Sequence, residues 1–349
     1  MAGGGGEIAG EEGSVADLGE WGVIAALKAR MPAGALTKVG IGDDSAVVGA
    51  PSGSVVAAVD LLIEGRHFRR EWSSAYDIGV KAAARSLADI AAMGAVNTAL
   101  LVALATPGTL PASWASDLAS GLAAEATRAG AGIVGGDTAR ADYVTLSVTA
   151  LGDLEGRSPV LRSGARPGDV IAVAGRLGHS AAGLALLEAG AVEPAASAAA
   201  PAALAELVAA HLRPAPLYDA GPEAARLGAT AMIDISDGLL ADLGHVAAAS
   251  GVQVNVKTAS LTVGTALHEA VARLSVLESS SRTAAGFSPT STALTWVLTG
   301  GEDHPLAAAF PPGTALPERW HVIGEVREGT GVTVDDKPHE GPAGWQHFR

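Results

Sequence analysis

Three features of this 349-residue sequence predict a two-domain protein of the α/β class: its length, its apolar content and its alternation of strand-like with helix-like segments. A chain of this length usually divides into two domains, because single hydrophobic cores stop growing at this size. Hydrophobic residues make up 48% of the chain, which suffices for a core in each domain. Short β-branched runs that alternate with longer segments of helical periodicity are typical of mixed α/β folds.

The first half of the chain supplies one complete set of such elements. A helix is expected over 18–31, where apolar residues recur at helical spacing before a proline. A longer helix is expected from Ser74, in a Ser/Asp-rich cap, to Gly94. The remaining expected elements are strands at 40–48, 54–65 and 97–105, a helix at 111–130 and a strand pair within 132–154.

The second half begins with a turn-rich connector, so we place the domain boundary near residue 156. Helices are expected at 179–190 and 201–213. We interpret 231–251 as a strand that turns into a helix, and 296–310 as a strand interrupted by a glycine turn. The predicted organisation is a flexible Gly/Glu-rich leader (1–18), an N-terminal domain (19–156) and a C-terminal α/β domain (157–349).

Composition excludes several classes of function. The formal net charge of -14 argues against a surface that holds nucleic acid or anionic lipid. The absence of cysteine excludes disulfides, thiolate metal sites and a cysteine nucleophile. The N-terminus does not have the pattern of a signal peptide, and the most apolar stretch, 90–105, is too short for a membrane span. We therefore expect a cytoplasmic protein without nucleic-acid or membrane partners.

Acidic residues that interrupt apolar or glycine-rich runs are the candidates for chemistry. Any one of them is more often a turn residue or a helix cap than a ligand, but several such acids in one chain favour a bound cation. They are Asp43 and Asp44 in "GIGDDSAVV", Asp60, Asp89, Asp137 in "VGGDTAR", Asp234 and Asp237 in "IDISDG", and Glu302 and Asp303 in "TGGEDH".

Two of these patterns have a plain structural alternative. Ser236 or Asp237 could cap the helix that follows, and a capped helix start is also a natural phosphate site. We expect Asp234 and Ser236, two apart on a strand, to project from the same face. Lys81, Arg85 and Asp89 share one helical face, which spacing alone assigns to a solvated stripe of ion pairs.

The standard nucleotide and protease motifs are absent from the sequence: G-x-G-x-x-G, G-x-x-x-x-G-K-[ST], G-x-S-x-G and H-E-x-x-H. Many carboxylates with neither a thiol nor an obvious histidine base fit phosphoryl transfer between two phosphates. Magnesium would bring the two polyanions together. A phosphate monoester is already an anionic nucleophile at neutral pH, so the reaction needs no general base.

Taken in order, the motifs resemble those of the thiamine-monophosphate kinase family, in the superfamily that includes aminoimidazole ribonucleotide synthetase. The resemblance runs from about residue 19 to the C-terminus. It rests on "GIGDDSAVV", "VDLLIEGRHF", "KAAARSLADIAAMGA", "VGGDTAR", "LRSGARPGD", "HSAAGL", "IDISDGLLADLGH" and "GGEDH".

The resemblance implies a two-domain synthetase-like fold and a homodimer in which the N-terminal mixed sheets pair. It implies direct transfer of phosphate from ATP to thiamine monophosphate, giving thiamine diphosphate, with several Mg²⁺ ions between the substrates. By motif position, Asp44, Asp60, Asp89, Asp137, Asp234 and Asp237 would bind magnesium; Gly136, Asp137, Arg162 and Ser236 would contact ATP; and His67, Glu302 and Trp345 would contact thiamine monophosphate.

Two departures from the family pattern concern Ala58 and Val59, where hydroxyl residues are frequent, and His304, where tyrosine is frequent. Two other functions remain open. One is a synthetase of the same superfamily that uses ATP to activate an amide, and the other is a non-catalytic regulator that binds nucleotide or metal. From sequence alone, His67 is a structural histidine and Trp345 a packed terminal aromatic.

Overall fold

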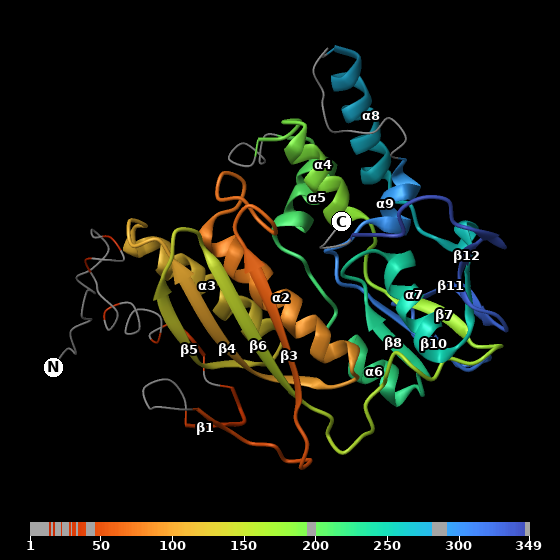
Figure 1. Ribbon diagram of the computed structural model, residues 1–349, viewed down its shortest axis with the longest axis horizontal. Coiled ribbons are helices and arrows are strands. Elements are labelled where there is room, and N and C mark those ends of the chain that lie inside the picture. Colours follow the sequence, from red (N-terminus) through yellow and green to blue (C-terminus); the bar gives the residue numbers. More distant parts are fainter. Residues whose placement is uncertain are drawn as a thin grey trace. The chain divides into compact units, whose positions relative to one another are not determined.

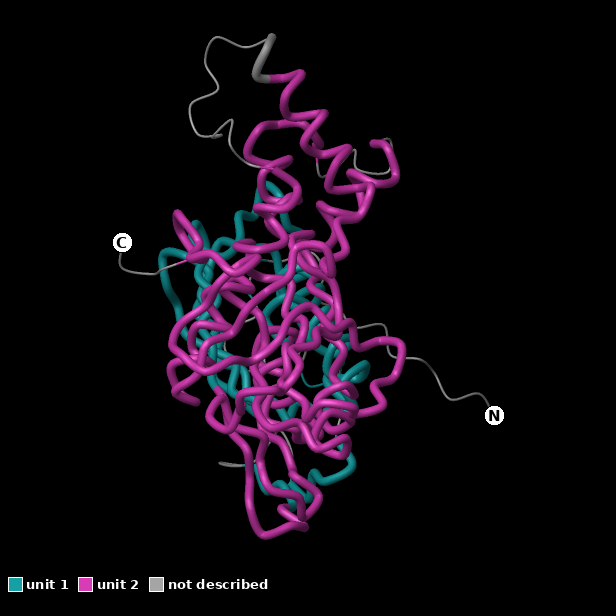
Figure 2. The backbone as a smooth tube through the Cα atoms, turned by 90° about the vertical axis from the view of Figure 1, so that its right-hand side faces the viewer, with its two compact units in different colours: residues 1–49, 59–83, 98–150 teal, residues 50–58, 84–97, 151–349 magenta. Residues whose placement is uncertain are grey.

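The computed structural model describes residues 14, 17, 22, 28, 30–32, 34–39, 46–193, 200–280 and 292–345. The expected helix over 18–31 and the expected strand at 40–48 lie largely outside this part of the chain, as do Asp43 and Asp44. The chain divides into two compact units, one formed by 1–49, 59–83 and 98–150 and the other by 50–58, 84–97 and 151–349 (Figure 2).

Most expected elements of the first half are present within a few residues of their predicted bounds. They are β3 (Val56–Ile63), α2 (Ala75–Ala92), β4 (Val96–Thr106), α3 (Ala112–Arg128), β5 (Gly132–Arg140) and β6 (Thr145–Asp153). The short strand β2 (Val47–Val48) lies at the end of the strand expected at 40–48, and β1 (Thr37–Val39) was not predicted. A small pair is formed by β1 and β2, and the other strands form a sheet in the order β3-β6-β4-β5, with β4 and β5 parallel (Figure 1).

One face of this four-stranded sheet is covered by α2 and α3 (Figure 1). The backbones of the two helices approach closely at Gly79 and Gly121, where an added Cβ would lie 2.2 Å from the Leu118 carbonyl oxygen and 2.0 Å from that of Tyr76, respectively. The other face carries exposed apolar side chains on its edge strand, because Val59 is 63% and Leu61 53% exposed. Among the described elements, no helix is seen to cover the face on which Val59 and Leu61 alternate along β3.

The remaining elements belong to the second unit. They are β7 (Val170–Ala174), α4 (His179–Glu188), α5 (Ala202–Leu212), α6 (Ala220–Arg226), β8 (Ala231–Asp234), α7 (Leu239–Ser250), β9 (Gln253–Val256), the 3₁₀ turn η2 (Thr258–Ser260), α8 (Thr265–Ser280), α9 (Ala293–Thr299), β10 (Leu306–Phe310), β11 (Trp320–Arg327), β12 (Gly331–Val334) and β13 (Lys337–Pro338). Their sheet has the strand order β13-β12-β9-β11-β7-β10-β8.

The strand predicted before the glycine turn is wrong: residues 293–299 form the helix α9. Thr292 caps this helix with its hydroxyl, which accepts the backbone N–H of Thr295, and the Thr295 hydroxyl accepts the backbone N–H of Thr292. Trp296, Val297 and Leu298 are all buried, and this continuous apolar run is what made a buried strand plausible. After the glycines, β10 is a central strand that pairs antiparallel with β7 and β8.

None of the described helices is both long enough and apolar enough to cross a membrane.

Candidate active site

The turn between β8 and α7, residues 235–238, is the centre of the candidate site. Asp234 ends β8, so Ser236 lies beyond the strand, and the expectation that the two share a strand face is wrong. The residue before α7 is Gly238, with no side-chain cap, so neither Ser236 nor Asp237 caps the helix. Instead, Asp242 Oδ2 accepts the backbone N–H groups of Ser236, Asp237 and Gly238, at 3.0, 3.0 and 3.1 Å.

The glycine-rich loop 300–304 lies directly against this turn. The Glu302 N–H donates to the Ser236 carbonyl oxygen at 2.8 Å, and the His304 N–H donates to that of Ile235 at 3.1 Å. Glu302 and His304 have positive φ values of 68° and 53°, which non-glycine residues adopt only at a cost of about 1–3 kcal/mol each. Such strain is concentrated at functional sites, and here it accompanies the contact between two motifs that lie far apart in the sequence.

His304 is buried beside the predicted metal ligand Asp234. The distance from His304 Nδ1 to Asp234 Oδ2 is 3.0 Å, and both side chains are almost completely buried. Burial alone would lower the pKa of His304, but the hydrogen bond and the charge of Asp234 outweigh it, so the pKa is raised. The histidine that departs from the family pattern thus contacts a site carboxylate directly.

Glu302 is held by Arg85 from α2. Arg85 Nη1 lies 2.6 Å from Glu302 Oε1, and the two side chains are 11% and 27% exposed, so the pair is largely shielded from water. The interpretation of Lys81, Arg85 and Asp89 as a solvated stripe is wrong, because Lys81 is 2% exposed and Arg85 reaches the glycine-rich loop. Asp89, one turn further along the helix, is half-buried.

The C-terminal segment docks onto the same turn. The Trp345 N–H donates to the Asp237 carbonyl oxygen at 2.9 Å. At the preceding residue, Gly344, an added Cβ would lie 2.4 Å from that same oxygen. The Trp345 side chain is 62% exposed, so it is not the packed terminal aromatic that the sequence alone favoured.

The structure thus brings together five of the predicted site residues: Asp234, Ser236, Asp237, Glu302 and Trp345. A sixth, Arg162, lies in the same unit on a loop fixed by Ser250, whose hydroxyl donates to the Arg162 carbonyl oxygen at 3.1 Å. The same hydroxyl accepts the backbone N–H groups of Gly164 and Ala165 at 3.1 and 3.2 Å. The Arg162 side chain itself is exposed.

Asp89 also lies in the second unit, whereas the remaining predicted residues belong to the first unit. Asp60 lies on β3, and Gly136 and Asp137 lie on β5, at opposite edges of the four-stranded sheet. Three strand spacings, about 14 Å, separate these edges, so within one chain we do not expect Asp60 and Asp137 to share a metal ion. His67 Nδ1 accepts the Ile63 N–H at 3.0 Å, which is the structural role expected of a lone histidine. Asp44 lies outside the described residues.

Among the described residues, no group of three or more His, Asp or Glu side chains is placed to hold a metal ion. Magnesium does not require such a cage, because one or two carboxylates with water and substrate phosphates suffice. The pKa of Asp242 is raised to about 7, mainly by burial and next by the charge of Asp234, with Asp237 adding to it. A cation near this turn would relieve that crowding of negative charge, so the donor set fits magnesium.

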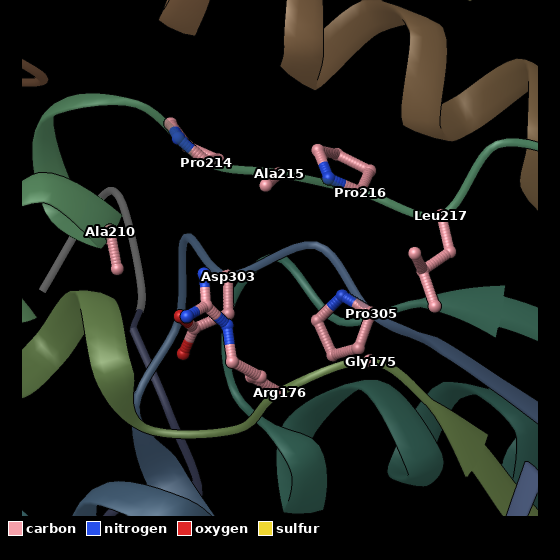
Figure 3. A pocket seen from close by; sticks show the side chains of 9 residues that line it. All are labelled: Gly175, Arg176, Ala210, Pro214, Ala215, Pro216, Leu217, Asp303 and Pro305. Atoms are coloured by element: carbon pink, nitrogen blue, oxygen red, sulfur yellow. The ribbon is translucent and has the colours of Figure 1, made fainter. Parts of the chain in front are cut away.

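Asp303 lines a small pocket. Figure 3 shows its carboxyl group beside Arg176, below the segment 214–217. Asp303 Oδ1 accepts the Ser180 N–H at 2.9 Å, whereas Oδ2 is buried without a hydrogen-bond partner. Burial raises the pKa of Asp303 to about 7, against the opposing effects of the Ser180 N–H and of Arg176.

Asp303→Asn is expected to remove a pH-dependent loss of stability. A carboxyl group whose pKa is raised from 3.8 to about 7 on folding stabilises the fold below pH 4, and this stability is lost as pH rises to 7. We would measure the melting temperatures of ligand-free variant and wild type between pH 4 and pH 8. The difference, variant minus wild type, should increase over this range by the equivalent of about 2–4 kcal/mol in the free energy of unfolding. A difference that does not change with pH would contradict the assignment.

Comparisons with known proteins match both halves of the chain. The family model described as AIR synthase related protein, N-terminal domain, matches residues 42–154, and the corresponding C-terminal domain model matches 166–337. The chain therefore belongs to the AIR synthase related family.

Within that family, the relatives of this chain include thiamine-monophosphate kinases. The chain is 45% identical to the thiamine-monophosphate kinase of Mycobacterium tuberculosis over 342 residues, which is 98% of this chain and 95% of the relative. It is similar to the crystal structure of thiamine-monophosphate kinase from Stenotrophomonas maltophilia K279a, with a TM-score of 0.74, 33% identity, and coverage of 90% of this chain and 95% of the other. It is also similar to the structure of AaThiL complexed with AMPPCP and TMP, with a TM-score of 0.74, 32% identity, and coverage of 95% and 98%. The chain is a member of the thiamine-monophosphate kinase family.

Sequence reasoning missed three contacts of this site: Asp242 with the turn, His304 with Asp234, and Arg85 with Glu302. A signal for the first was present, because Asp242 lies between Leu239, Leu243 and Val246 on the apolar face of its helix. A carboxylate on a buried face needs hydrogen-bond partners. The other two depend on residues 70 and 217 positions apart in the chain, and one sequence has no local signal for such pairs.

Proposed function

We propose that this protein transfers the γ-phosphoryl group of ATP to thiamine monophosphate, forming thiamine diphosphate and ADP. The observation that carries the proposal is the contact of Ser236 and Asp237, assigned to nucleotide and metal, with Glu302 and Trp345, assigned to the thiamine side. One site then holds both substrates, as direct transfer requires. The kinase relatives supply the identity of the acceptor.

In this reaction a phosphate oxygen of thiamine monophosphate forms the new bond to the γ-phosphorus, and the bond from that phosphorus to the β-phosphate oxygen breaks. No side chain needs to accept a proton, because the attacking phosphate is already ionised. The Glu302 carboxylate, held by Arg85, is placed to attract the cationic thiazolium. The exposed Trp345 ring stacks on the same heterocycle. Together these two side chains orient the acceptor.

Arg162 and Ser236 contact the nucleotide, and Gly136 brings backbone close to its phosphates. In the proposed set, Asp44, Asp60, Asp89, Asp137, Asp234 and Asp237 hold Mg²⁺, which neutralises the phosphate oxygens of both substrates. Burial, and next the charge of Asp234 with a smaller effect of Asp237, raises the pKa of Asp242, and the negative charge of these two neighbours supports their place in the set.

We also propose a homodimer formed through the uncovered face of the four-stranded sheet. Val59 and Leu61 expose apolar area there that association would remove from water. We propose that residues 1–18 are a leader and that the boundary between the two domains lies near residue 156. We also propose a cytoplasmic location, where ATP is available.

The proposed reaction is tested by phosphorus NMR of the purified protein with ATP, Mg²⁺ and thiamine monophosphate. We expect thiamine diphosphate resonances to grow one for one with ADP. Release of free phosphate with unchanged thiamine monophosphate would instead indicate a synthetase of the same family. No consumption of ATP by folded protein would contradict any kinase or synthetase activity.

A further inference from the structure

We propose that Asp242 is a positioning residue for phosphoryl transfer, because its carboxylate sets the conformation of the turn that presents Ser236 and Asp237. The inference rests on the proposed function, in which these two residues contact ATP and Mg²⁺. Asp242 itself points into the protein and is 3% exposed, so it does not touch the substrates.

The geometry of the turn carries the inference. A single oxygen, Asp242 Oδ2, accepts three successive N–H groups, those of residues 236, 237 and 238, at 3.0 to 3.1 Å. The carbonyl oxygens of the same turn accept hydrogen bonds from other segments. The Ser236 oxygen accepts the Glu302 N–H, and the Asp237 oxygen accepts the Trp345 N–H. Each of these two residues is therefore held at both its N–H and its carbonyl group. These contacts fix the backbone of the turn and therefore the direction of the Cα–Cβ bond of Ser236 and of Asp237.

The number of N–H groups that Asp242 accepts also indicates a specific role. Its carboxylate is buried, and one of its oxygens accepts three backbone N–H groups. A Ser, Thr or Asn at the helix start would satisfy one N–H group without burying a carboxylate. An acceptor that reaches three consecutive N–H groups from the first turn of α7 holds the whole turn, which a cap on one N–H group does not.

The test compares Asp242→Ala with Asp169→Ala. Asp169 is a matched control in the same unit: it is 4% exposed, and its Oδ2 accepts the Arg166 N–H at 2.9 Å and the Thr230 hydroxyl at 2.6 Å. For each variant we would measure the melting temperature, the affinity for a non-hydrolysable ATP analogue with Mg²⁺ by calorimetry, and kcat and KM for both substrates. The binding measurement makes the result independent of whether thiamine monophosphate is the acceptor.

For Asp242→Ala we expect affinity for the analogue to fall about 10-fold and kcat about 100-fold, as displacement of reacting groups by about 1 Å produces. KM for thiamine monophosphate should change less than about threefold. Asp169→Ala should change the affinity, kcat and KM by no more than about threefold, even if its melting temperature falls as far as that of Asp242→Ala. Asp242→Asn keeps an acceptor oxygen and should recover most of both losses.

Wild-type affinity and kcat in folded Asp242→Ala would overturn the proposal, as would equal losses in Asp169→Ala or no recovery in Asp242→Asn. Should Asp242→Ala not fold, Asp242→Glu replaces it, because the added methylene displaces the carboxylate while keeping its charge. The same selective loss is then expected, and wild-type values would overturn the proposal. Wild-type protein that binds the analogue without forming thiamine diphosphate would contradict the proposed function alone.

Discussion

Asp137→Asn is expected to lower kcat for thiamine diphosphate formation at least about 1000-fold, equivalent to about 4 kcal/mol of transition-state stabilisation. The proposed role of Asp137 is to hold Mg²⁺ against the phosphates, and an amide is a much weaker ligand for this cation than a carboxylate. The fold should not suffer. The side chain is exposed, and its Oδ1 accepts the neighbouring Thr138 N–H, which an asparagine oxygen also accepts.

The matched control for this variant is Asp142→Asn. Asp142 is also exposed and lies just beyond β5, the strand that carries Asp137. The Asp142→Asn variant therefore loses one negative charge at a residue outside the proposed site. We expect wild-type kcat for the control, and melting temperatures within about 2 °C of wild type for both variants. Turnover by Asp137→Asn at the wild-type rate in saturating Mg²⁺ would refute the metal assignment.

Gly301→Ala is expected to lower kcat about 100-fold and to destabilise the fold by about 2–4 kcal/mol. An added Cβ would lie 2.2 Å from the Ser236 carbonyl oxygen and 3.1 Å from the Asp237 carbonyl carbon. Both neighbours are backbone atoms and cannot move aside as a flexible side chain would. The loop 300–304 must therefore separate from the turn, which breaks the hydrogen bond from the Glu302 N–H to Ser236.

Gly244→Ala provides the comparison, because Gly244 lies in α7 and an added Cβ there meets nothing within 4 Å. A helical Gly to Ala change of this kind should stabilise the protein by about 0.5–1 kcal/mol and leave kcat unchanged. Chemical denaturation and steady-state kinetics of the two variants check both expectations. Wild-type kcat in Gly301→Ala would show that the contact between loop and turn does not shape the site.

Local pattern was enough to predict the elements with strong periodicity or clear ends. The helix α2, the strand β4 and the change from β8 to α7 lie where apolar spacing and flanking polar or glycine residues predicted them. The segment 296–299 was assigned wrongly because a short, wholly apolar run does not distinguish a buried strand from a buried helix. In the folded protein, the Thr292 cap and the burial of the side chains of this segment stabilise the helix α9.

By itself, the sequence determined the alternation of helices and strands, the absence of thiol chemistry, the acidic motifs and their family. Those properties depend on residue type and on spacing within one element. Only the tertiary structure decided that Arg85 pairs with Glu302, that His304 lies against Asp234, and that Asp242 rather than Ser236 or Asp237 holds the turn. The physical reason is that a buried polar group must find a partner, and which partner it finds depends on the packing of segments far apart in the chain.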